Sequence, residues 1–335
     1  MASISTKCFA CKEPRKLTEE HIIPQSIGGR LTASLYCKKC NSDLGRTLDA
    51  AISDTFGHIA TTLSIKRQRG TSQAFAVEEV DAKTRLLFDG KRLVRKNPIV
   101  KYKVKEDGKT LDFVDVTGRS QKERDKIMQS LKARYRTSGE EKTWEEQRPG
   151  PVDTMYARAI DTTLTRRAVT KMAYGLLCHK IPSTEVFSKA FDEARAYIRF
   201  GTGSDLATAN FVHTRFMCDY IRPLHKIHIN FDRRNALVVG YVMIFGIFRF
   251  SVLLSKSYSS WLEWPCLDYT YDPVAMRVIE GSPFFRAPAL SEVQILRPKQ
   301  SKQLVRQELI TCHKILEEYV EGYKFLDIEF EQPQE

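Results

Sequence analysis

Several features that mark common classes of protein are missing from this chain of 335 residues. It has no internal repeat, no heptad pattern and no glycine-rich loop that could cradle a phosphate. A repeat protein, a coiled coil and a P-loop nucleotide-binding protein are therefore not expected. The N-terminus also lacks the basic segment, apolar segment and cleavage site of a secretory signal. We expect a reducing, cytoplasmic setting.

Long apolar runs are scarce too, and only residues 237–254 could be mistaken for a membrane span. This stretch contains Arg249 and two glycines, and it is rich in Val, Ile, Phe and Tyr, which favour strands. A helix in lipid needs about 20 predominantly apolar residues with few or no charges. We therefore predict buried strands of a sheet here, and no membrane partner.

The charges are unbalanced. The chain has 53 Lys and Arg against 41 Asp and Glu, a net charge of +12 with a pI near 9.2. A basic surface attracts phosphate backbones, although many basic proteins bind no nucleic acid. The excess of basic residues therefore supports a nucleic-acid partner only if the chain also has a site that could act on nucleic acid.

Four of the eight cysteines lie within the first 41 residues, in two pairs of equal spacing. Cys8 and Cys11 form one C-x2-C pair, and Cys37 and Cys40 form the second after 25 intervening residues. Two such pairs are typical of a tetrahedral zinc site, because four thiolates complete the coordination of Zn²⁺. The alternative is four buried free thiols, which the matched spacing disfavours. We predict a structural zinc ion on these residues.

An acid, an imidazole and an amide accompany this cysteine pattern. Glu20 and His21 lie between the two pairs, and Asn41 directly follows the last cysteine. A purely structural zinc ribbon needs none of these three side chains. Their placement predicts that the zinc stabilises a small active site.

These residues resemble the HNH nucleases, also called the ββα-metal or His-Me finger family. In that family a strand carries an Asp/Glu-His dipeptide, and a glycine-containing loop reverses the chain. A helix beginning near C-x-x-C-N then brings an asparagine to the same metal. Here Glu20-His21, Gly28-Gly29 and Cys37–Asn41 occur in that order, within about residues 1–60. The resemblance implies a zinc-stapled ββα finger and an enzyme that hydrolyses phosphodiester bonds.

The resemblance also implies a role for each residue. His21 would be the general base that takes a proton from the attacking water. Glu20 and Asn41 would hold a Mg²⁺ or Mn²⁺ ion, since hard cations prefer oxygen ligands. Asp49, two helical turns after Asn41, is predicted as a third ligand, with an ordinary exposed helix carboxylate as the alternative. His58 is expected to be a surface or packing histidine.

Two positions depart from the family pattern. Glu20 stands where Asp is more common, but either carboxylate can bind a hard cation. Thr32 stands where many members have an asparagine that holds the loop near the histidine. Thr32 or Ser34 could replace that asparagine through a hydroxyl, and the sequence does not decide between them.

The fold class expected is α+β, in three parts. A nuclease finger occupies residues 1–65. A β-rich basic region with a helix occupies residues 66–150. A C-terminal α+β domain with a sensor or assembly role occupies residues 151–335. The polar segment 138–152, with its glycines and prolines, marks the second boundary. The other elements expected are a hairpin of residues 99–105 and 110–116 and helices at 120–136, 163–179, 183–200 and 301–319.

Basic side chains on the finger and on the predicted hairpin are the expected DNA contacts. They are Arg30, Lys38, Lys39, Lys101, Lys103 and Lys105. The three hairpin lysines alternate along one strand and therefore share a face. An exposed edge strand protected by lysines explains them equally well.

Together these features predict a metal-dependent DNA endonuclease. A small finger joined to a larger unrelated domain resembles restriction or antiphage-defence effectors, whose second domain senses modified DNA, a partner protein or a small signalling molecule. Two alternatives stay open: a catalytically inactive, zinc-stapled nucleic-acid-binding module or scaffold, and an RNA-directed nuclease. A homodimer is one assembly state open to the chain.

Overall fold

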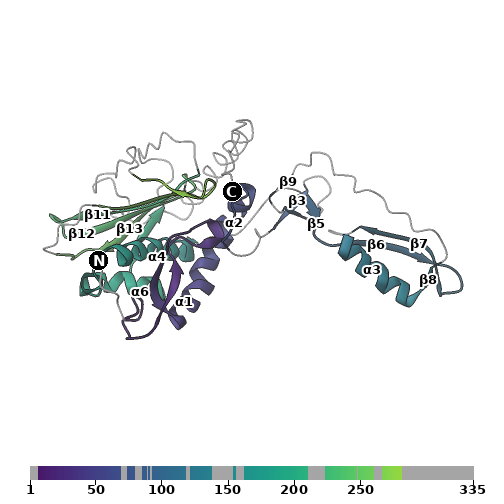
Figure 1. Cartoon of the computed structure of the whole chain (residues 1–335), viewed down its shortest axis with the longest axis horizontal. Coiled ribbons are helices and arrows are strands. Elements are labelled where there is room, and N and C mark those ends of the chain that lie inside the picture. Colours follow the sequence, from purple (N-terminus) through teal and green to yellow (C-terminus); the bar gives the residue numbers. More distant parts are fainter. Residues whose placement is uncertain are drawn as a thin grey trace, which may run out of the picture. The chain divides into compact units, whose positions relative to one another are not determined.

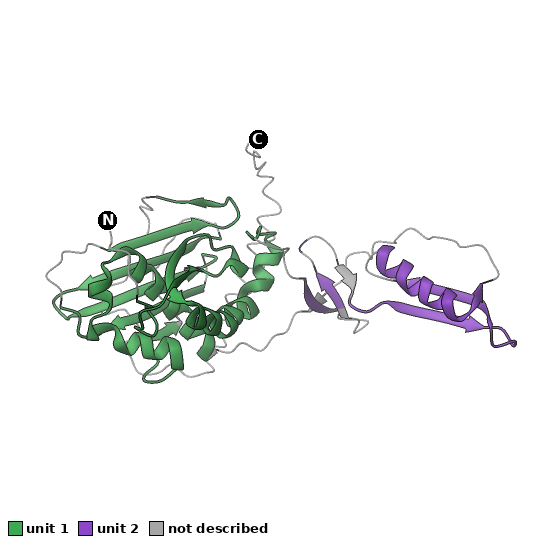
Figure 2. Cartoon of the chain, turned by 60° about the horizontal axis from the view of Figure 1, so that its bottom comes forward, with its two compact units in different colours: residues 1–72, 160–335 green, residues 73–159 purple. Residues whose placement is uncertain are grey.

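The computed structural model of the chain divides into two compact units (Figure 2). One consists of residues 1–72 with 160–335, and the other of residues 73–159. The residues described are 7–68, 74–79, 85–88, 90, 93–117, 121–137, 154–155, 162–209, 223–246, 248–259 and 266–280. The predicted boundary segment at 138–152 and the predicted helix at 301–319 lie outside the described residues.

The larger unit begins with the finger, in which two strands precede a helix (Figure 1). Its elements are β1 (Leu17–His21), η1 (Gln25–Ile27), β2 (Thr32–Cys37), α1 (Lys38–Leu44), the π-helical turn η2 (Gly45–Asp49) and α2 (Ala50–Thr62). β1 and β2 are antiparallel, with Leu17 opposite Cys37 and His21 opposite Thr32. The predicted ββα arrangement is confirmed.

Two glycines shape the loop that joins these strands. Gly28 has φ +94°, a left-handed conformation that side chains rarely adopt. Gly29 is needed for a different reason, because a Cβ placed there would lie 1.9 Å from the carbonyl oxygen of Ile23. The close approach of these two backbone segments holds the turn directly after His21.

The rest of the larger unit is an antiparallel sheet with helices on one face. The helical elements are α4 (Thr162–Lys180), α5 (Ser183–Val186), η3 (Lys189–Phe191) and α6 (Asp192–Phe200). The strands are β10 (Ala207–Ala209), β11 (His225–Asp232), β12 (Leu237–Ile244), β13 (Phe248–Ser255), β14 (Leu267–Asp272) and β15 (Arg277–Val278). They are ordered β10-β13-β12-β11-β14-β15.

The strands predicted within residues 237–254 are confirmed as β12 and β13, which pair with each other in the middle of this sheet. Most of their residues are buried, which explains why the stretch is almost wholly apolar. Within the part of the chain that the structure describes, no helix has the length and apolar character to cross a membrane.

Helix α4 lies between the sheet and the finger (Figure 1). One hydrophobic core includes Ile22 and Phe56 of the finger, Met172 of α4, and Ile227 and Val242 of the sheet. The finger and the C-terminal part, treated as separate domains in the sequence, therefore share one core.

Polar contacts join α4 to the finger along its length. Thr165 and Thr55 have hydroxyls 3.2 Å apart, and the Tyr174 hydroxyl donates to the carbonyl oxygen of Phe9 at 3.3 Å. Next to Tyr174, a Cβ added at Gly175 would lie 3.6 Å from the side chains of Ile22 and Leu35 of the finger, within van der Waals contact. The backbone of α4 thus approaches the finger closely.

The prediction of one continuous helix over residues 183–200 is wrong. The chain instead forms α5, η3 and α6, and Ser188 adopts an extended conformation between the first two. The guanidinium of Arg195 donates to the carbonyl oxygens of Val186 at 2.6 Å and Ser188 at 2.9 Å. The Arg195 side chain thus bonds to both carbonyls at the break, and the Ser188 carbonyl oxygen also accepts from the backbone N–H of Phe191 at 3.4 Å.

The smaller unit contains two sheets and a helix. Its elements are β3 (Phe75–Glu79), β4 (Arg85–Phe88), β5 (Leu93–Arg95), β6 (Ile99–Val104), β7 (Thr110–Thr117), α3 (Gln121–Arg134), β8 (Arg136–Thr137) and β9 (Thr154–Met155). The sheet orders are β5-β4-β3-β9 and β6-β7-β8. The predicted hairpin (β6 and β7) and the predicted helix after it (α3) are confirmed.

The loop geometry leads to a test with two glycine substitutions. Gly29→Ala should destabilise the larger unit by about 1–3 kcal/mol, because the new Cβ can be accommodated only if backbone shifts. Gly57→Ala is the matched control, since its Cβ would lie 3.5 Å from Ser53 Oγ, an ordinary contact. Gly57→Ala should stabilise the larger unit by roughly 0.5–1 kcal/mol, because alanine favours a helix such as α2 more than glycine does. Denaturant unfolding of both variants measures the difference, and equal stabilities would contradict this description of the loop.

Candidate metal centre and active site

The four cysteines of the two C-x2-C pairs converge. Their Sγ atoms lie within 4.8 Å of one another. Cys8 and Cys11 precede β1, Cys37 ends β2, and Cys40 lies in the first turn of α1. The backbone N–H of Cys37 also donates to Cys8 Sγ at 3.3 Å. Four converging thiols suit tetrahedral Zn²⁺, so this cluster can hold the predicted structural ion.

Hydrogen bonds favour the metal-binding form of one of these thiols. Burial would raise the pKa of Cys37, but hydrogen bonds from the Cys40 backbone and from neighbouring cysteine side chains lower it to about 7. Burial raises the pKa of Cys8. Zinc binding would therefore displace a proton from Cys8, whereas Cys37 is already partly a thiolate near neutral pH.

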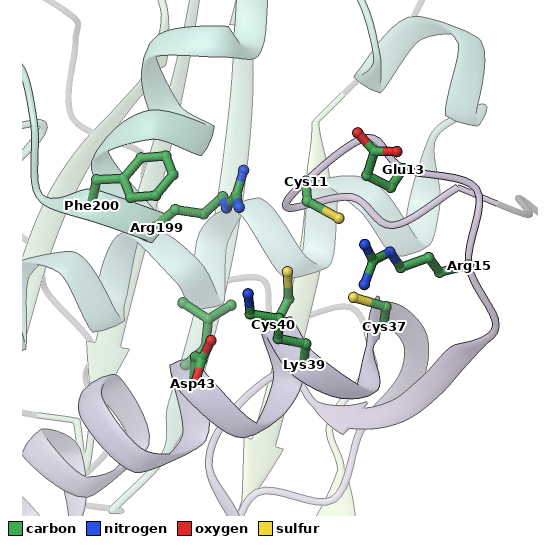
Figure 3. Close-up of a pocket in the computed structure, with 10 residues that line it drawn as sticks. Cys11, Glu13, Arg15, Cys37, Lys39, Cys40, Asp43, Arg199 and Phe200 are labelled. Atoms are coloured by element: carbon green, nitrogen blue, oxygen red, sulfur yellow. The ribbon is translucent and has the colours of Figure 1, made fainter.

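A pocket of about 250 Å³ opens beside the cysteine cluster (Figure 3). Its charged lining residues are Arg15, Lys39, Arg199, Glu13 and Asp43. Phe200, which is 61% exposed, lies on the same side as Arg199, whose guanidinium is 4.5 Å from the ring centroid. The pocket thus combines an excess of basic side chains with an exposed aromatic ring.

Glu20 and His21 differ in exposure although they are adjacent on β1. Successive side chains of a strand point to opposite faces, and here Glu20 is buried while His21 is half-buried. His21 Nε2 lies 2.9 Å from Oε1 of Gln68, a residue that follows α2. The carboxylate thus faces the interior, whereas the imidazole remains accessible to a substrate.

Asn41 is hydrogen-bonded to the strand that carries this dipeptide. Its Nδ2 donates to Thr18 Oγ1 at 2.9 Å and to the Glu19 carbonyl oxygen at 3.1 Å. Because both of these bonds use the amide nitrogen, Oδ1 is the atom left to coordinate a cation. Thr32 adds a second connection, since its hydroxyl donates to Glu19 Oε1 at 2.9 Å. Thr32 therefore holds the two strands together beside His21.

The carboxylates of Glu20 and Asp49 meet a buried lysine of α4. Lys171 Nζ donates to Glu20 Oε1 and, at 2.7 Å, to Asp49 Oδ1. The side chains of Lys171 and Glu20 are only 3% and 8% exposed, and that of Asp49 is 26% exposed. We call Glu20, Lys171 and Asp49 the ion triad.

The ion triad contains two carboxylate groups but one ammonium group. Burial alone would lower the pKa of Lys171, but the charges of Asp49 and Glu20 and their hydrogen bonds outweigh it and raise the pKa. Burial raises the pKa of Glu20, against the opposing effect of Lys171. Lys171 is therefore held in its charged form.

The donor atoms near His21 can be compared with the needs of a divalent ion. Glu20 offers a carboxylate and Asn41 an amide oxygen, and both suit Mg²⁺ or Mn²⁺. One Glu20 oxygen already accepts from Lys171, but a carboxylate has lone pairs for a second contact. The chemistry of this pair fits a divalent ion. Asp49 would have to share its carboxylate between Lys171 and the ion.

The predicted DNA contacts of the finger have different environments. Lys38 and Lys39 are exposed on the first turn of α1. Arg30 donates to the backbone oxygen of Lys66 at 3.0 Å and also contacts Met276 of the β14–β15 turn. The two lysines are thus open to a partner, whereas Arg30 also joins parts of the fold.

The predicted contacts of the hairpin lie beside acidic residues. Lys101, Lys103 and Lys105 are exposed, but Asp115 of β7 stands opposite Lys101. Lys103 Nζ lies 3.8 Å from Asp112 Oδ2. This partial neutralisation reduces the basic character of the hairpin face.

The sequence reasoning missed Lys171 and Gln68. Lys171 carried a signal, because it is the one charged residue in the apolar stretch from Ala168 to Leu177. A charge in an apolar helix face needs a partner. Gln68 had no comparable signal, since it lies in a polar segment after α2.

Comparison with known proteins supports the finger specifically. The family model described as HNH endonuclease matches residues 8–57. No curated protein and no solved structure matches the chain significantly. The resemblance stated from the sequence is thus confirmed for the segment from the first cysteine pair into α2.

The cysteine geometry predicts one structural zinc per chain. Cys37→Ser should release the metal and unfold the finger, and because the finger shares its core with α4 and the sheet, the thermal midpoint of the larger unit should fall as well. Cys266→Ser is the control, since Cys266 is exposed and outside the cluster. Metal analysis with thermal unfolding tests this, and a zinc-free variant with an unchanged midpoint would disprove it.

Proposed function

We propose that the HNH-type finger at residues 8–57 makes this chain a metal-dependent endonuclease that hydrolyses DNA phosphodiester bonds. One observation carries the proposal: Asn41 of α1 is hydrogen-bonded to the backbone of Glu19, next to Glu20 and His21. Three polar residues of the family pattern are thereby brought to one end of the finger. A zinc ribbon used only for structure or binding has no need of this arrangement.

His21 is the general base in this proposal. Its half-buried imidazole can reach a water molecule, and Gln68 Oε1 lies within hydrogen-bond distance of Nε2. When Nε2 carries the proton it donates to Gln68, and Nδ1 is then the atom that accepts the proton of the attacking water. Gln68 thus selects the tautomer and orientation of the ring.

Glu20 and Asn41 would hold a Mg²⁺ or Mn²⁺ ion. Such an ion, when bound, supplies positive charge that offsets the charge developing on the phosphate group. The role of the protein here is to present one carboxylate and one amide oxygen on rigid elements. Asn41 is fixed by its two bonds to β1, and Glu20 is fixed by Lys171.

The DNA backbone would lie along the exposed basic residues of the finger. Lys38 and Lys39 begin α1, and Lys39 also borders the pocket that contains Arg15 and Arg199. Arg30 and the hairpin residues Lys101, Lys103 and Lys105 are further candidate contacts. Their acidic or backbone partners make them weaker candidates than the two lysines of α1.

The larger α+β part would recognise a trigger. By analogy of architecture, the proposal places the chain among restriction or antiphage-defence nucleases, with modified DNA, a partner protein or a small signalling molecule as the input and a homodimer as one form of assembly. The second candidate function is an inactive, zinc-stapled DNA-binding module. The accessible imidazole of His21 favours the enzyme.

The role of His21 can be tested by substitution. His21→Ala should lower the rate of plasmid cleavage with Mg²⁺ or Mn²⁺ by ~10²- to 10⁴-fold, the usual cost of losing a positioned base. The stability of the variant should change by no more than about 0.5 kcal/mol, because the hydrogen bond between His21 and Gln68 lies at the exposed surface. His58→Ala, in the same finger, should cleave at the wild-type rate. A His21 variant with more than about a tenth of the wild-type activity would contradict the assignment.

The DNA interface can be tested through salt dependence. In a His21→Ala background, where DNA is bound but not cut, Lys38→Ala/Lys39→Ala should reduce the slope of log K against log salt. The expected reduction is about 0.9 for each phosphate that the protein no longer neutralises. Lys256→Ala is the control, because this exposed lysine pairs with Glu193 and is not a predicted contact. If the double variant has an unchanged slope, the two lysines do not contact the backbone.

A further inference from the structure

The ion triad places an ammonium group between two carboxylates that the sequence assigned to a divalent ion. Lys171 Nζ is within hydrogen-bond distance of both Glu20 and Asp49. Its side chain is 3% exposed, and Lys171 itself lies on α4, 151 residues after Glu20 in the sequence. A cation bridging the two carboxylates would need the space that this ammonium occupies.

Burial gives these contacts energetic importance. An ion pair on the surface contributes little, whereas a charged lysine in the interior is stable only with its counter-ions in place. Asp49 lies at the end of the π-helical turn η2, and Glu20 lies on β1. Lys171 therefore connects α4 to both the strand and the helix of the finger.

The two carboxylates have different environments. Glu20 is buried, so its orientation depends on Lys171, and it lies beside His21 in the sequence. The side chain of Asp49 is 26% exposed, and it forms an ion pair with Lys171. Asp49 therefore balances the charge of Lys171, whereas Glu20, next to His21 on β1, is the carboxylate whose orientation Lys171 fixes.

We propose that Lys171 is a positioning residue of the nuclease site, which fixes Glu20 and engages Asp49, so that Asp49 acts through Lys171 and not as a metal ligand. This inference rests on the proposed function. The C-terminal part of the larger unit then completes the active site of the finger. The divalent ion is left with Glu20 and Asn41.

The test measures Mn²⁺ binding directly, by calorimetry, on the full chain with its zinc in place. Asp49→Asn should leave the Mn²⁺ affinity within about threefold of the wild type, because the ammonium separates Asp49 from the ion. Lys171→Met removes a positive charge near the ion and should raise the affinity on the order of tenfold or more. In the Lys171→Met background, Asp49→Asn should then weaken binding, because Asp49 can reach the ion only when the ammonium is gone.

Cleavage provides the second measurement. Lys171→Met should lower kcat by at least about tenfold because Glu20 loses its anchor, and Lys171→Arg, which keeps the charge, should restore part of that loss. Lys226→Met is the matched control: the Lys226 side chain is also 3% exposed and pairs with Asp268, and both residues lie on strands of the sheet. It should lower the thermal midpoint without changing the affinity for Mn²⁺.

Three outcomes would overturn the inference. One is that Asp49→Asn weakens Mn²⁺ binding by about tenfold or more while Lys171 is present, which would make Asp49 a direct ligand. The second is that Lys171→Met shows only the stability loss of the Lys226 control. The third is that Lys171→Arg restores no activity. If Lys171→Met does not fold, the Mn²⁺ affinity of Asp49→Asn tests the role of Asp49, and the kcat of Lys171→Arg, which changes the geometry of the bonds but keeps the charge, tests the positioning of Glu20.

Failure of the proposed function gives a different result. If the wild type cleaves neither DNA nor RNA with any divalent ion, the nuclease proposal fails. The Mn²⁺ affinities of the Asp49 and Lys171 variants still show whether the two residues are coupled as inferred.

Discussion

A buried ammonium group stays charged only if negative groups surround it, and Lys171 meets this condition by joining α4 to the finger. Its two carboxylate partners, Glu20 and Asp49, come from a strand and from the helical segment that follows the second strand. Removing one partner of such a buried pair typically costs about 3–5 kcal/mol, because a charge is left unpaired. The relative placement of α4 and the finger therefore depends on this interaction. The hydroxyl contacts of Thr165 and Tyr174 reinforce it.

The same interaction separates the two side chains of the Glu-His dipeptide. Because β1 is a strand, directing Glu20 toward Lys171 leaves His21 on the accessible side. The cysteine cluster fixes the start of α1, and Asn41 is held against β1 from there. A zinc ion on the four cysteines would thus stabilise the arrangement of strands and helix, whereas the ion triad orients the carboxylate. The four cysteines all belong to the finger, whereas the ion triad needs Lys171 of α4.

Local patterns predicted much of this arrangement, and distant contacts account for what they missed. The spacing of Cys8, Cys11, Cys37 and Cys40 was sufficient to predict that these four side chains converge, because the geometry of a zinc site restricts the spacing of its ligands. The β6–β7 hairpin was predicted from the alternation of side chains along the strands and from the turn sequence between them. The break within residues 183–200 depends on where Arg195 points, and helical periodicity contains no information about that. Lys171 was missed because its partners lie 151 and 122 residues away.

The position of a bound Mn²⁺ ion tests the central claim most directly. Anomalous scattering from a crystal soaked in Mn²⁺ locates the ion without reference to activity. The account predicts one site between Glu20 and Asn41, with Lys171 still bonded to Glu20 and Asp49. An ion that bridges Glu20 and Asp49, with Lys171 displaced, would contradict it.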